Sequence, residues 1–169
     1  PGWDPDLWNP HNVKFWARAA IGVAALAMAT AFFVRYGAVT LDPRNDALYP
    51  FAAPGAITLV QKRFFRLRAG DRVLYEDPAT GELRAGRIRA APGDRVQLSG
   101  NCLRFPGDTR CALTPAQLQR WKNLDGSPVK ENEYLIINEN LSSTLPDSRA
   151  VGFIPRARIR CRVILQSPF

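Results

Sequence analysis

Apolar residues are arranged in two different ways along this chain. Residues 19–34 form an unbroken run, AAIGVAALAMATAFFV, which has no charged residue and is bounded by Arg18 and Arg35. A helix of this length spans about 24 Å, slightly less than the ~30 Å hydrocarbon core of a bilayer. Aromatic residues stand at both ends of the run, where they would lie at the membrane interfaces. The pattern predicts one transmembrane helix over residues 19–36.

The apolar run also fits two other structures. A cleaved signal peptide normally has a short basic leader, whereas residues 1–18 include two aspartates, Asp4 and Asp6. A buried core helix is compatible with the high alanine content of the run and its moderate hydrophobicity. We favour the membrane anchor, with residues 1–18 as a separate N-terminal segment.

After residue 55 the apolar residues occur in short runs that are separated by turn-forming residues. The predicted strands are residues 56–62, 71–76, 82–89, 95–98, 133–138, 151–154 and 159–165. Residues 37–55 are rich in proline and glycine and are predicted to be a linker. Residues 99–132 are predicted to be an insert with one short helix over residues 114–121. The expected fold is a mainly β domain over residues 56–169 that follows a single helix.

The charge of the chain narrows the choice of partners. The formal net charge is +8 at pH 7, and the basic residues are spread along the sequence. No zinc-finger motif or glycine-aromatic repeat accompanies them, so nucleic-acid binding is not expected. A basic surface that faces lipid or another protein is the preferred interpretation.

The cysteines predict a crosslink rather than a metal site. Cys102, Cys111 and Cys161 do not follow a CxxC spacing, and the single histidine, His11, is distant in sequence. Neither a metal nor a cofactor is therefore expected. Cys102 and Cys111 bracket a short Pro-Gly segment, which predicts a hairpin closed by a disulfide in an oxidising compartment. The alternative is two buried free thiols, and Cys161 is expected to be a buried, unreactive residue.

Three segments, in their order along the chain, resemble one protein family. Residues 69–75 (AGDRVLY) resemble the GDxVxF strand of the type I signal peptidases, and residues 88–96 (IRAAPGDRV) are similar to that family's lysine strand, which ends in PGD. Residues 140–155 (NLSSTLPDSRAVGFIP) resemble its final motif, in which DSR precedes a GF-apolar-P sequence. The resemblance covers about residues 56–169. The short length is most similar to the small branch that matures conjugative pilins.

The resemblance implies a signal-peptidase-like domain of two antiparallel sheets at the outer face of a bacterial inner membrane. It also implies a groove that takes an extended peptide as an added strand. In active members a serine attacks the scissile bond and a buried neutral lysine takes its proton. Basic residues flank both ends of the apolar run and do not decide its orientation, so the predicted disulfide does. The N-terminal segment is expected in the cytoplasm and the β domain in the periplasm.

Both residues of the catalytic dyad are missing from this sequence. The nucleophile position is expected at Ala52 or Ala53, in residues 49–55 (YPFAAPG), which contain no serine, threonine or cysteine. The lysine position, counted back from the PGD turn, falls on Gly86. The charged neighbours of Gly86 are arginines, which stay protonated at any workable pH and cannot act as the base. The chain is interpreted as a family member without the dyad.

The DSR motif of the family is retained as Asp147, Ser148 and Arg149. By resemblance, the acid and the base tie their loop down through an ion pair and hydrogen bonds. Ser148 is matched to the position that orients the lysine in active members. Without a lysine to orient, a structural role is expected for Ser148, such as capping the turn.

Three functional hypotheses follow. The leading one is a non-catalytic structural or assembly subunit of a membrane complex, which binds other membrane or secreted proteins and takes no small-molecule substrate. The alternative is an active serine peptidase for exported or pilin-like precursors. Its relocated dyad would combine Ser142, Ser143 or Ser148 with Lys62 or Lys130. A third interpretation is a basic β domain that binds an anionic surface.

Overall fold

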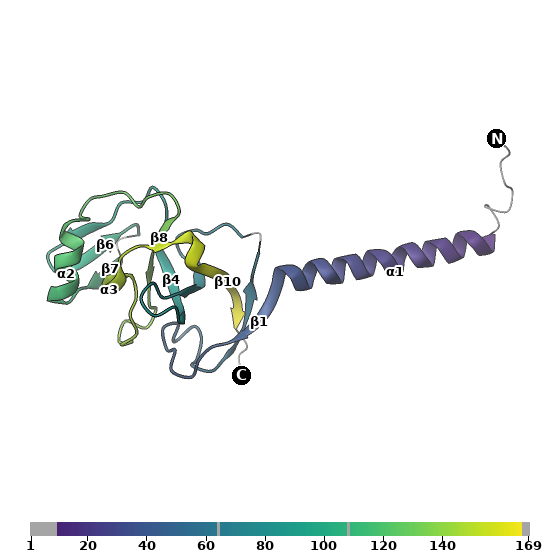
Figure 1. Ribbon diagram of the computed structural model, residues 1–169, viewed down its shortest axis with the longest axis horizontal. Coiled ribbons are helices and arrows are strands. Elements are labelled where there is room, and N and C mark those ends of the chain that lie inside the picture. Colours follow the sequence, from purple (N-terminus) through teal and green to yellow (C-terminus); the bar gives the residue numbers. More distant parts are fainter. Residues whose placement is uncertain (1–9, 64, 108, 167–169) are drawn as a thin grey trace.

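A long helix and a β domain make up the computed structural model, which describes residues 10–63, 65–107 and 109–166 (Figure 1). The helices are α1 (Pro10–Arg35), α2 (Pro115–Lys122) and α3 (Ser148–Val151). The strands are β1 (Tyr36–Thr40), β2 (Ile57–Gln61), β3 (Arg72–Glu76), β4 (Leu83–Ala90), β5 (Gln97–Ser99), β6 (Cys102–Phe105), β7 (Thr109–Ala112), β8 (Glu133–Ile137), β9 (Ile154–Pro155) and β10 (Ile159–Gln166). The predicted mainly β fold with one N-terminal helix is confirmed.

Helix α1 projects away from the β domain (Figure 1). Its residues Val13–Arg35 have a mean hydropathy of 1.8, and none of this stretch is buried against the rest of the chain. Its 23 residues are long enough to cross a membrane. A helix that buries none of its apolar residues is not a core helix of this domain, so that interpretation is wrong. The helix also takes in the second half of the predicted N-terminal segment, while residues 1–9 lie outside the described part of the chain.

Helix α1 leads directly into the sheet. Arg35 ends the helix and Tyr36 begins β1, which pairs antiparallel with β2. Residues 37–40 of the predicted linker are therefore part of a strand, because the proline-rich sequence starts only after residue 41. The domain is attached to its helix without an intervening loop.

The strands form two antiparallel sheets. The larger sheet has seven strands in the order β1-β2-β10-β3-β4-β8-β9, and the smaller has three in the order β5-β6-β7. The smaller sheet and α2 are built largely from the predicted insert. Helix α2 begins at a capping box, in which Thr114 and Gln117 bond reciprocally to each other's main chain. Its Trp121 is buried in the core beneath the smaller sheet.

The loop between β1 and β2 is packed against the larger sheet rather than being a loose connection. Leu48 and Ala52 of this loop are fully buried, and they join a cluster with Leu74 of β3 and Ala85 of β4. The loop is therefore held in place beside β4.

The predicted disulfide between Cys102 and Cys111 is wrong. In the β6–β7 hairpin Cys102 lies opposite Ala112, and Cys111 lies opposite Leu103. Opposite residues share a face and successive residues alternate, so the two thiols lie on opposite faces of the hairpin. All three cysteines are free, with Cys111 and Cys161 buried. Without this disulfide, the cysteines do not indicate which side of the membrane the β domain lies on.

Candidate functional site

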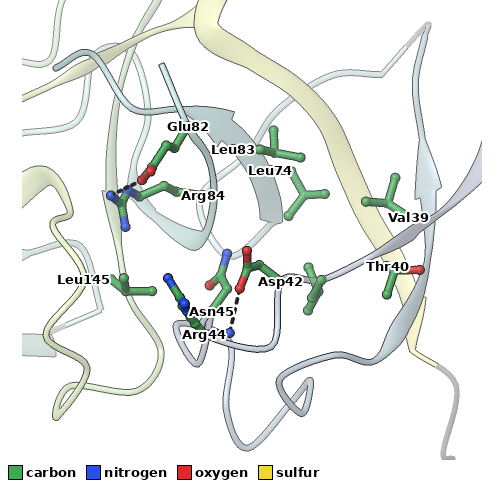
Figure 2. Close-up of a pocket in the computed structure, with 11 residues that line it drawn as sticks. Val39, Thr40, Asp42, Arg44, Asn45, Leu74, Glu82, Leu83, Arg84 and Leu145 are labelled. Atoms are coloured by element: carbon green, nitrogen blue, oxygen red, sulfur yellow. Dashed lines mark hydrogen bonds and ion pairs between the residues drawn. The ribbon is translucent and has the colours of Figure 1, made fainter. Parts of the chain in front are cut away.

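A groove of about 570 Å³ lies between the loop that follows β1 and the first residues of β4 (Figure 2). Residues 39–42, 44 and 45 form one wall, residues 82–84 form the other, and Leu74 and Leu145 complete the lining. The lining residues are Val39, Thr40, Leu41, Asp42, Arg44, Asn45, Leu74, Glu82, Leu83, Arg84 and Leu145. The groove is therefore built from two segments that are about 40 residues apart in the sequence.

The half of β4 that borders the groove has an open edge. On one side β4 pairs with β3 over residues 83–87, but on the other side β8 pairs only with residues 87–90. Within the described chain, residues 83–86 have no strand partner on that second side. The main-chain groups of Glu82 and Ile88 form hydrogen bonds on the β3 side. Successive residues of a strand turn their main-chain N–H and C=O groups to alternate sides. Leu83 and Ala85 therefore turn their main-chain N–H and C=O groups to the open side.

Most of the charged side chains that line this groove form ion pairs or hydrogen bonds with other residues of the protein. Nε of Arg84 lies 2.9 Å from Oδ2 of buried Asp77, and its Nη2 lies 2.7 Å from Oε2 of Glu82 (Figure 2). Oδ1 of Asp42 accepts a hydrogen bond of 2.7 Å from the main chain of Arg44. Five lining residues are valine or leucine. The groove is thus suited to apolar side chains rather than to one strongly charged group.

The expected nucleophile positions lie in the loop before β2 and do not line the groove. Ala52 is fully buried and donates its N–H to the carbonyl of Leu48 at 3.0 Å, whereas Ala53 is exposed. No serine, threonine or cysteine occurs anywhere in residues 41–55. This loop therefore offers no hydroxyl or thiol nucleophile, whichever of its residues occupies the family's position.

Gly86, the expected lysine position, lies in a buried part of β4 where no side chain fits. A Cβ atom there would stand 2.6 Å from Cγ2 of Ile136 and 3.6 Å from Cε1 of Tyr75. The Tyr75 hydroxyl lies close by and donates to the carbonyl of Pro146 at 3.4 Å. Burial raises the pKa of the Tyr75 phenol, and the neighbouring carboxylates of Asp147 and Asp77 raise it further. Tyr75 is therefore a neutral phenol at physiological pH and does not replace the lysine as a base.

The DSR motif closes the free edge of β8 with side chains. Ser148 Oγ accepts a hydrogen bond of 2.8 Å from the main-chain N–H of Ile136, and Asp147 Oδ2 accepts one of 3.0 Å from Asn138. Asp147 also caps α3, and its carboxylate pairs with Arg149, whose Nη2 lies 2.9 Å from Oδ2. Two buried main-chain donors are thereby satisfied, one in β8 and one directly after it.

The serines proposed for a relocated dyad have other partners. The hydroxyl of Ser143 donates to Oδ1 of Asp46 at 2.5 Å, and that of Ser148 is bound to β8 as described. Ser142 is exposed, and the Lys62 side chain lies against Gly37, next to the end of α1. In the part of the chain that the structure describes, no hydrogen bond joins a serine hydroxyl to a lysine amine.

A cluster that the sequence does not reveal surrounds the largely buried carboxylate of Glu139. Glu139 accepts hydrogen bonds from Arg72 at 2.7 and 2.9 Å and from Arg87 at 3.2 Å. The Arg72 guanidinium also stacks 3.6 Å from the centre of the Phe51 ring. In the sequence, Arg72 lies 67 positions from Glu139 and Arg87 lies 52 positions from it. No local pattern therefore reveals the cluster.

Comparison with known proteins places this fold in a family. The family model for signal peptidases, peptidase S26, matches residues 14–167 of this chain. A crystal structure of signal peptidase I from Enterococcus faecalis V583 is 18% identical with a TM-score of 0.41, and the match covers 60% of this chain and 99% of that one. No curated protein matches the chain.

Proposed function

Because this chain belongs to the signal peptidase family, peptidase S26, we propose that it is a membrane-anchored, non-catalytic member. Its β domain binds an extended segment of another membrane or secreted protein, as a structural or assembly subunit of a membrane complex. Helix α1 is the single anchor, and the domain lies on the periplasmic side of a bacterial inner membrane.

The observation that carries this proposal is the groove beside the open edge of β4. An extended peptide can bond to the main-chain groups of Leu83 and Ala85 and so add a strand to the sheet. Side chains of such a peptide alternate between two faces, and every second one would meet the apolar lining near Leu74 and Leu145. The groove thus favours a segment with small or apolar side chains at alternate positions.

The composition of the groove supports binding without cleavage. Its lining has no serine, cysteine, lysine or histidine. The cations in the lining are the guanidinium groups of Arg44 and Arg84, which have no lone pair to take a proton from the hydroxyl of Thr40. An active peptidase with a relocated dyad is the second candidate, and no contact among the described serines and lysines favours it.

The periplasmic orientation is supported by the family alone. Cys102 is the one cysteine of the three that is not buried, so it reports on the side of the membrane. A membrane-impermeant maleimide added to intact spheroplasts is expected to label Cys102, and a Cys102→Ser variant is expected to stay unlabelled. Labelling of Cys102 only after the membrane is permeabilised would place the domain in the cytoplasm.

Photo-crosslinking of the full chain in native membranes tests the binding proposal. A photoreactive amino acid at Leu83 or Leu145 is expected to crosslink to the same segment of one partner, as mapped by mass spectrometry. Gln119, which is exposed on α2 and does not line the groove, is the control position. Crosslinks from Gln119 that equal those from Leu83, or peptide fragments released by cleavage, would contradict the proposal.

A further inference from the structure

A second depression in the surface, here named the basic pocket, is lined almost entirely by cations. Its volume is about 650 Å³. The lining residues are Lys62, Arg63, Phe65, Arg66, Arg156, Ile159 and Arg160. Seven residues thus carry five positive charges and no negative one, although they come from two distant parts of the chain.

The basic pocket lies where α1 meets the β domain. The main-chain N–H of Lys62 donates to the carbonyl of Arg35, the last residue of α1, at 2.8 Å. The Lys62 side chain lies against Gly37, the second residue of β1. No linker separates α1 from β1 (Figure 1). The side of the basic pocket that contains Lys62 therefore lies beside the end of the helix.

Three cations of the basic pocket have no partner side chain among the described residues. Arg160 is held by two hydrogen bonds of 2.7 Å to Glu76, and Arg156 stacks on the Phe65 ring at 4.6 Å. Lys62, Arg63 and Arg66 are exposed. Among the described residues, none of these three has a carboxylate within salt-bridge distance, and they lie close together in sequence. Water and solvent ions screen the repulsion among these three side chains, and an anionic ligand relieves it further.

We propose that the basic pocket binds the phosphate groups of anionic phospholipids and so holds the β domain against the membrane surface. The inference rests on the proposed role of α1 as a membrane anchor, which puts Arg35 and Lys62 at headgroup level. Arginine and lysine side chains bind phosphate oxygens through charge-assisted hydrogen bonds. An acidic protein segment is complementary in charge as well, but lipid headgroups are the anions that the anchor brings to this place.

The test uses the full chain in nanodiscs of phosphatidylcholine alone or with about 30% phosphatidylglycerol. Hydrogen–deuterium exchange of residues 62–67 is the measurement. Exchange is expected to slow in the anionic nanodiscs, and about 0.5 M sodium chloride is expected to abolish the difference. Each basic side chain near an anionic surface is worth about a fivefold change in affinity, so K62Q/R63Q/R66Q is expected to weaken docking roughly 100-fold.

Two matched variants make the result interpretable. R104Q/R120Q/K122Q removes the same charge from β6 and α2, at the end of the domain away from α1, and is expected to retain the protection (Figure 1). K62R/R63K/R66K keeps the charge and is expected to behave as the unaltered chain does. Equal exchange of residues 62–67 in both kinds of nanodisc would overturn the inference. An equal loss of protection in the two variants that remove charge would overturn it as well. Failure of the chain to enter either nanodisc would instead overturn the anchor.

Discussion

The clearest quantitative prediction concerns Gly86. Gly86→Ala places a methyl group 2.6 Å from Cγ2 of Ile136 and 3.4 Å from the carbonyl oxygen of Ile137. Ile136 is fully buried, and its branched Cβ leaves Cγ2 little freedom to move away. Overpacking of this kind costs about 1–3 kcal/mol. For a domain of this size, the loss corresponds to a fall in Tm of roughly 3–10 °C.

The assay is thermal unfolding of the full chain in a mild detergent, followed by near-ultraviolet circular dichroism of the β domain. Gly22→Ala is the matched control, because nothing lies within 4 Å of the added methyl group and the site is in α1. Ile136→Ala removes the clashing atom, so the loss from Gly86→Ala is expected to shrink by at least about 1 kcal/mol in that background. The packing argument would be refuted by a Gly86→Ala variant that is as stable as the unaltered chain. It would also be refuted if the stability losses of Gly86→Ala and Ile136→Ala were strictly additive in the double variant.

The same geometry predicts that restoring the family's residues does not restore a peptidase. Lysine at position 86 has to enter the space that is closed by Ile136 and Tyr75, so Gly86→Lys is expected to lose more stability than Gly86→Ala. Ala52→Ser combined with Gly86→Lys is expected to leave a signal-peptide substrate uncleaved. Cleavage that depends on both substitutions would show that the dyad site survives intact.

Three further predictions concern buried polar groups. Glu139→Ala removes the carboxylate that two arginines share and is expected to cost about 1–3 kcal/mol in urea unfolding, whereas Glu76→Ala at an exposed pair costs less than about 1 kcal/mol. Ser148→Ala leaves the buried N–H of Ile136 without its acceptor, at a cost of about 1–3 kcal/mol in the same assay, and Ser148→Thr recovers part of it. Burial raises the pKa of Cys161 to about 11. Because the unfolded thiol ionises near pH 9, stability is expected to fall as pH rises from 9 to 11, and a Cys161→Ala variant would lack this component of the fall.

The sequence was sufficient for the features that depend on local patterns. The unbroken apolar run of residues 19–34 determines the helix, and short apolar runs between turn residues determine most strands. The strand predicted over residues 151–154 is wrong, because Val151 ends α3 and only Ile154 of this segment is in a strand. The insert helix was found within one residue of its observed limits, because Thr114, Pro115 and Gln117 form a strong start signal. The family could also be predicted from the sequence, because each of its motifs is a contiguous segment.

Features that depend on pairing between distant segments could not be predicted. The spacing of Cys102 and Cys111 is compatible with a hairpin, but a shift of one residue in register decides whether their side chains share a face. Strand β1 was missed because its pairing with β2 across the intervening loop is not visible locally. The groove and the Glu139 cluster likewise join residues that only the fold brings together.

The most direct test of the account is Leu83→Pro, measured by recovery of the partner with the tagged full chain from gently solubilised membranes. Leu83 is 46% exposed and its N–H faces the open side of β4, so proline removes that donor without breaking the pairing with β3. Leu83→Pro is expected to lose a partner that is recovered in stoichiometric amount with Leu83→Ala. Equal recovery with both variants, while the crosslinks from the groove persist, would contradict binding by strand addition.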